Sequence, residues 1–156
     1  MRITRLRSAL LLLFSVAQSG CSASSSEGMP AAAQSPQTQT LTVGPEGGTI
    51  EVGGGKVVFP AGALAAAKVI TISTTTSVPE GFVAVSKVFE CEPSGTDFAA
   101  PVTMTMPFTD DGQGPLTMFW SAGADPTFKD VGGKADGALM TTTIRHFSSG
   151  FVGRKK

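Results

Sequence analysis

Short runs of alternating apolar and polar residues recur from Leu41 to the end of the chain, and this period of two restricts the fold more than any other feature. In residues 102–106, valine and methionine alternate with threonine (VTMTM), and in residues 70–73 isoleucine alternates with threonine and serine (ITIS). Such alternation is typical of strands that bury one face. Glycine, proline and aspartate lie between the runs, as in Asp110-Asp111-Gly112, and predict turns.

Short strands separated by turns at this spacing favour an all-β fold, an antiparallel two-sheet β-sandwich. The expected strands are Thr40–Val43, Gly48–Val52, Lys56–Phe59, Val69–Thr75, Phe82–Glu92, Val102–Pro107, Leu116–Trp120, Phe128–Val131, Leu139–Arg145 and Phe147–Val152. The segment Ala61–Ala67 is the one helix candidate. The expected core residues are Phe59, Ile70, Ile72, Phe89, Val102, Met104, Phe119 and Trp120.

The first 20 residues have the pattern of a signal peptide. Three arginines lie within the first seven residues, and the run from Ala9 to Ala17 is apolar apart from Ser15. Such a run is too short to span a bilayer, which takes about 20 residues, but it suits the apolar region of an export signal. We therefore expect residues 1–20 to be a leader, and the protein to be exported.

Small residues precede Cys21 at the end of this apolar run, in Ser19-Gly20-Cys21. This arrangement resembles the lipobox of bacterial lipoproteins. The resemblance implies cleavage before Cys21, lipid on its sulfur, and a membrane as partner. Ser22 in place of aspartate favours the outer membrane of the cell envelope. The alternative is an ordinary secretory signal that is cut nearby.

Residues 21–39 are rich in serine, alanine, glutamine and proline, which predicts a disordered tether. The β-domain is expected at residues 40–153, followed by a basic tail at 154–156. The chain has two cysteines. If Cys21 carries lipid, Cys91 has no disulfide partner, and its place between Glu90 and Glu92 predicts a buried apolar role and a raised thiol pKa.

Charge argues against some functions. The chain carries 12 basic and 12 acidic residues, and removal of the leader with its three arginines leaves an acidic excess. A weakly acidic domain has no electrostatic footprint for nucleic acid. The sequence also shows no phosphate-binding loop, zinc pattern or defensible catalytic triad, so we expect no cofactor and no enzyme activity on a separate substrate.

Three stretches in order resemble a known family of β-sandwiches. They are Gly47-Gly48 followed by residues 57–64 (VVFPAGAL), residues 89–102 with their Pro93-Ser94-Gly95 turn and Pro101-Val102, and His146-Phe147-Ser148. Together they are similar to ZU-five domains, found in netrin receptors, ankyrins and bacterial surface proteins. The resemblance implies a sandwich that acts as a structural or interaction module, whose partner would be an envelope or extracellular protein or polymer.

In some ZU-five proteins a His-Phe-Ser triplet cleaves itself once between Phe and Ser. The resemblance therefore implies that Ser148 attacks the Phe147 carbonyl, with His146 as general base, a role for which an unperturbed pKa near 6.5 is suited. If all three residues lie in one strand, His146 and Ser148 share a face. The alternative is structural, with Phe147 in the core and His146 hydrogen-bonded at a sheet edge.

Two further candidates remain. Asp110 and Asp111 could bind calcium, although acidic pairs at such places usually form turns. A carbohydrate-binding module would need exposed aromatic rings, and the chain has one tryptophan and no tyrosine. We therefore expect no metal site and place carbohydrate binding below the interaction module and self-cleavage.

Overall fold

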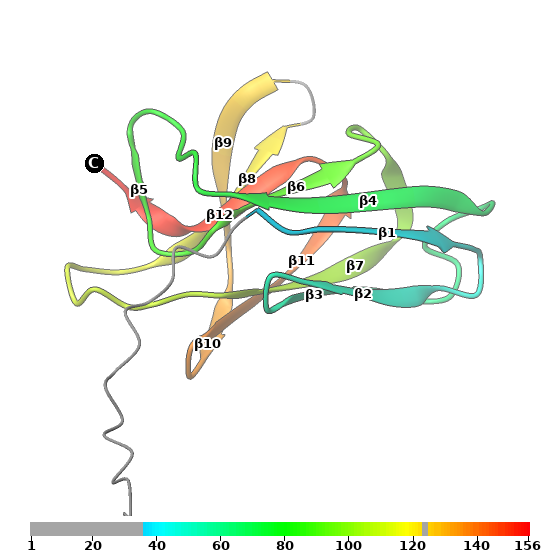
Figure 1. Ribbon diagram of the computed structural model, residues 1–156, viewed down its shortest axis with the longest axis horizontal. Helices are drawn as coiled ribbons and strands as arrows, with labels where there is room; N and C mark the ends of the chain where they lie inside the picture. Colours follow the sequence, from blue (N-terminus) through cyan, green and yellow to red (C-terminus); the bar gives the residue numbers. More distant parts are fainter. Residues whose placement is uncertain (1–35, 123–124) are drawn as a thin grey trace, which may run out of the picture. The chain divides into compact units, whose positions relative to one another are not determined.

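The computed structural model describes residues 36–122 and 125–156, and these form an all-β domain (Figure 1). The strands are β1 Thr38–Val43, β2 Gly48–Val52, β3 Gly55–Phe59, β4 Lys68–Thr75, β5 Phe82–Ala84, β6 Val88–Glu92, β7 Asp97–Pro107, β8 Thr117–Ala122, β9 Asp125–Gly132, β10 Lys134–Asp136, β11 Leu139–His146 and β12 Ser149–Lys155. No segment of the described residues is helical. The expected signal peptide and Cys21 lie outside them.

The strands form two antiparallel sheets. The first has the order β1-β4-β6-β12-β8-β9, with β5 paired to the far end of β12, and the second has the order β10-β11-β7-β3-β2. Figure 1 shows β2, β3 and β7 facing β1 and β4 across the interior. The prediction of an antiparallel two-sheet β-sandwich is confirmed.

Alternation along the strands fills the space between the sheets. Ile70 and Ile72 of β4 are fully buried, as are Val102, Met104 and Met106 of β7. All eight residues predicted for the core are buried. Phe119, however, packs with Phe151 and Val88 in a second, smaller cluster, separate from the main core that holds its neighbour Trp120. Neighbours in a strand point to opposite faces, so β8 supplies both clusters.

The prediction of a helix at Ala61–Ala67 is wrong. These residues form turns and bends that close one end of the sandwich. Gly62 has a φ of 79°, which is incompatible with a right-handed helix, and its N–H donates to the Pro45 carbonyl at 2.7 Å. Ala63 and Leu64 are buried in the core, so tertiary contacts override the helix propensity of this short alanine-rich segment.

Some strand boundaries also differ from those expected. The single strand predicted at Phe82–Glu92 is broken by a loop into β5 and β6. β10 was not predicted, because its residues Lys-Ala-Asp are all exposed and show no alternation. The tail predicted at 154–156 is mostly part of β12, in which Arg154 pairs with Val83. Within the described part of the chain, no helix is long and apolar enough to cross a membrane.

Candidate functional site

The triplet His146-Phe147-Ser148 lies where the chain passes from one sheet to the other. β11 ends at His146 in the second sheet, and β12 begins at Ser149 in the first. The three residues therefore do not lie in one strand, which was the condition for His146 and Ser148 to share a face, and the two-residue alternation of a strand does not bring their side chains together. The Phe147–Ser148 peptide is instead the crossover between the two layers.

The crossover is held by backbone hydrogen bonds to the end of β6 and the turn that follows it. The Phe147 N–H donates to the Thr96 carbonyl at 2.9 Å, and the Gly95 N–H donates to the Phe147 carbonyl oxygen at 2.8 Å. The Cys91 N–H donates to the Ser148 carbonyl at 2.9 Å. The Phe147 N–H, the Phe147 carbonyl and the Ser148 carbonyl are thus each oriented by a backbone partner, as buried peptide groups require.

The Phe147 side chain anchors the crossover in the core. It is fully buried, and its ring meets those of Phe59 and Phe98 edge to face, with centroids 5.7 and 4.9 Å apart. Such pairs contribute about 0.5–1.5 kcal/mol each beyond the burial of their area. The structural alternative for Phe147, a place in the core, is what the structure shows.

His146 lies beside the crossover with its ring partly exposed. Its Nε2 is 3.0 Å from the Ser121 carbonyl oxygen, and its own carbonyl accepts a hydrogen bond from Trp120 Nε1–H at 3.2 Å. Because a carbonyl only accepts, Nε2 must carry the hydrogen, and Nδ1 is the basic atom of the neutral ring. Nε2 is therefore unsuited to deprotonating Ser148 while this bond holds.

A second serine lies against Ser148. The hydroxyls of Ser121 and Ser148 are hydrogen-bonded, both residues are buried, and Ser121 Oγ also accepts the Ser149 N–H at 3.2 Å. Ser121 follows Trp120 in β8, so the strand that supports the His146 carbonyl also places this hydroxyl. No sequence pattern pointed to Ser121, which directly follows the expected strand Leu116–Trp120 and belongs to no motif.

The remaining sequence candidates have structural roles here. Cys91 is buried in the core and forms no disulfide within residues 36–122 and 125–156. Burial, followed by the charges of Glu92 and Glu90, raises the pKa of its thiol far above the usual range. Asp110 Oδ1 accepts the Gly112 N–H at 2.8 Å, which makes a turn. Asp111 forms a bidentate ion pair with Arg154, at 2.7 and 2.8 Å. No group of three potential metal ligands exists among the described residues.

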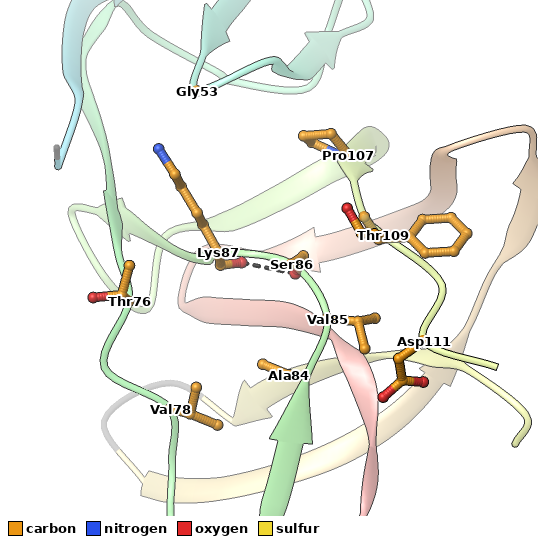
Figure 2. Close-up of a pocket in the computed structure, with 11 residues that line it drawn as sticks. Gly53, Thr76, Val78, Ala84, Val85, Ser86, Lys87, Pro107, Thr109 and Asp111 are labelled. Carbon is orange, nitrogen blue, oxygen red and sulfur yellow. Dashed lines mark hydrogen bonds between the residues drawn. The ribbon is translucent and has the colours of Figure 1, made fainter. Parts of the chain in front are cut away.

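The structure also holds a groove that the sequence analysis did not anticipate. It has a volume of about 690 Å³ and is lined by the β2–β3 turn, the loop after β4, the β5–β6 connection and the end of β7. We call it the Lys87 groove. Figure 2 shows the Lys87 side chain extending toward Gly53 of that turn. Its lining comes from four separate parts of the sequence, which explains why no local pattern revealed it.

The fold and these contacts define an all-β sandwich domain in which the triplet passes from one sheet to the other. A sequence model of the ZU5 domain family matches residues 39–115, so this part of the chain is ZU5-like, as the resemblance to ZU-five domains implied. His146, Phe147 and Ser148 lie outside the matched residues. A search of the curated proteins gives no match to this chain.

Proposed function

We propose that this protein is an exported lipoprotein that displays its ZU5-like domain at the cell envelope as a structural or interaction module. ZU5 domains mediate protein–protein interactions, and the match to that family carries the proposal. The arginine-rich start, the apolar run and Cys21 support lipid attachment and a membrane location, with the outer membrane preferred. Several acyl chains hold a protein on a bilayer stably, since each buried methylene contributes about 0.8 kcal/mol.

The chain's two cysteines allow a matched test of the anchor. Cys91 is buried and faces the core, so it serves as the control for Cys21. We expect wild type and Cys91→Ala to appear in the membrane fraction, with a mass that includes acyl chains, and Cys21→Ala to lose both. A soluble wild type whose mass corresponds to an unmodified mature chain would contradict the anchor and favour ordinary secretion.

Self-cleavage between Phe147 and Ser148 is the second candidate function, and one observation favours it. The Gly95 N–H already points at the Phe147 carbonyl oxygen, at 2.8 Å, where negative charge would develop if Ser148 attacked. The Ser121 hydroxyl touches Ser148 Oγ and can help to orient it. These two contacts supply part of what an acyl shift requires.

In this reaction Ser148 Oγ forms a bond to the Phe147 carbonyl carbon, and its proton passes to a base, for which His146 Nδ1 is the candidate. The carbon–nitrogen bond then breaks, the Ser148 nitrogen takes up a proton, and an ester remains. Water cleaves the ester to leave a carboxylate on Phe147 and to restore the hydroxyl of Ser148, whose amine is already free. Because Phe147 and Ser148 are buried, water reaches the ester only if the crossover opens. Burial thus opposes the last step.

Intact mass under denaturing conditions tests this candidate, with Ser148→Ala as the inactive variant and Ser149→Ala as the neighbouring control. Cleavage would release the fragment 148–156 from wild type and Ser149→Ala but not from Ser148→Ala. Addition of hydroxylamine should speed the release, because this nucleophile cleaves esters and spares amides. Whole chains in every sample, with and without hydroxylamine, would leave the triplet with a purely structural role.

A further inference from the structure

The Lys87 groove contains a buried amino group that lacks a hydrogen-bond partner among the described residues. Lys87 Nζ is buried and has no hydrogen-bond partner in the described part of the protein. Asp111 is the other charged residue in the lining, and both of its oxygens are bound by Arg154. Leaving an ammonium buried and uncompensated costs free energy, and such groups are normally paired. The groove therefore lacks an anion that would complete it.

The chemistry of the lining favours a carboxylate as this anion. One ammonium balances one carboxylate, whereas a phosphate dianion would place an uncompensated negative charge near Asp111. Thr76 and Thr109 add hydroxyls to the same lining, and they form no hydrogen bonds through their side chains in the described structure. Hydroxyl and ammonium groups both donate to carboxylate oxygens.

A strand edge that is only partly covered lies in the same groove: directly after β5, the Val85 carbonyl accepts the Thr109 N–H at 3.0 Å. Among the described strands, β5 pairs only with β12. The Val85 N–H, just after β5, donates to the Val152 carbonyl of β12 at 2.9 Å. Alternate residues of an antiparallel pair direct their backbone groups to the partner, so Ala84 directs its own groups away from β12. Ala84 lines the groove, and Figure 2 shows Val78 across from it.

We propose that the Lys87 groove binds an extended peptide segment, with the carboxylate of an acidic residue on Lys87 Nζ and the peptide backbone along the open edge of β5. Addition of a strand to a sheet edge provides affinity through main-chain hydrogen bonds, and side-chain contacts provide specificity. Val78, Val85 and Pro107 offer apolar contacts for the flanking side chains. This inference rests on the proposed interaction function and specifies its partner as an acidic peptide.

The test uses the full-length protein in detergent and two blocked, fluorescently labelled heptapeptides of alternating valine and threonine. One has glutamate at its centre and the other glutamine. We expect fluorescence anisotropy to show that the glutamate peptide binds wild type at least tenfold more tightly, and that Lys87→Met abolishes this difference. Lys56→Met is the matched control, because Lys56 is exposed and pairs with Glu51 at 3.2 Å, and it should retain the preference.

Urea unfolding of the same variants separates binding from structure. Lys87→Met removes an unpaired buried ammonium and keeps an apolar stem of similar length, so it should unfold at the same urea concentration as wild type or a higher one. A lower midpoint would assign Lys87 a structural role and overturn the proposal. Equal binding of the two peptides by wild type, or no binding of either, would also overturn it. So would binding of the acidic polysaccharide polygalacturonate in place of the peptides. Membrane fractionation does not depend on peptide binding or on urea unfolding. A failure of the proposed lipid anchor would therefore be detected separately from a failure of the peptide proposal.

Discussion

Gly150 shows at the scale of one residue how closely the crossover packs. It pairs with Trp120 in the neighbouring strand, and a Cβ added to it would lie 2.6 Å from Trp120 Cζ3 and 2.7 Å from the Phe119 carbonyl oxygen. A backbone oxygen cannot turn aside as a flexible side chain can. The position two residues after Ser148 therefore accepts glycine for reasons of space.

Substitution of this glycine should destabilise the domain. We expect Gly150→Ala to lower the free energy of unfolding by about 1–3 kcal/mol, the usual cost of overpacking a filled interior. Gly48→Ala is the control, because its Cβ would meet only Val43 Cγ1 at 3.8 Å and the backbone there needs no positive φ. Urea unfolding compares the two variants. Equal urea midpoints for the two variants would show that Trp120 and the neighbouring backbone shift readily to make room for the added methyl group.

At the scale of elements, alternation predicted the strands that contribute to the core, because burial of one face imposes that period on the sequence. It failed where pairing depends on distant segments. β5 and β6 read as one run, yet they pair with opposite ends of β12, and the loop at Ser86 and Lys87 spans the gap. Likewise, His146-Phe147-Ser148 was visible as a motif, but its partners Gly95 and Ser121 are set by topology alone.

The end of β12 provides a prediction about pH. The hydrogen bonds from Arg154 hold the pKa of Asp111 below its ordinary value near 3.8, which ties β12 to the segment after β7. A carboxyl whose folded pKa is lowered stabilises the fold above its unfolded pKa and loses that effect as the pH falls through the folded pKa. Wild type should therefore be more stable than Asp111→Asn at pH 7, and the difference should shrink as the pH falls below about 3.8 and vanish once the pH lies below the lowered pKa of Asp111.

Urea midpoints at several pH values measure this difference. Asp110→Asn removes the same charge from the adjacent residue, which caps the turn and makes no hydrogen bond with Arg154, so it is the control. Since both partners of the ion pair are partly exposed, added salt should reduce the effect. If the difference in urea midpoint between wild type and Asp111→Asn is the same at pH 3 and pH 7, ionisation of Asp111 is excluded as its cause.

At the scale of the whole domain, the crossover at Phe147 is one of several places where the chain passes from one sheet to the other, and it places a buried aromatic ring between them. Its ring contacts Phe59 of β3 and Phe98 of β7 in the main core, while its backbone continues into β12 at the centre of the other sheet. Loss of this ring should therefore weaken both layers together. We expect Phe147→Ala to lower the free energy of unfolding by about 3–5 kcal/mol, as for other buried aromatic residues.

Two probes would show whether the layers unfold as one. Trp120 of the first sheet reports by its fluorescence, and amide exchange of β3 and β7 reports on the second. In Phe147→Ala, the unfolding midpoints from Trp120 fluorescence and from amide exchange should both move to lower urea by the same amount. Phe128→Ala, which removes a half-buried ring packed against the second, smaller cluster, should cause a smaller shift. If only β3 and β7 lost protection, the sheets would be separate cooperative units. In that case the crossover would act as a hinge, and the opening that hydrolysis of a Phe147 ester needs would be available in the folded protein.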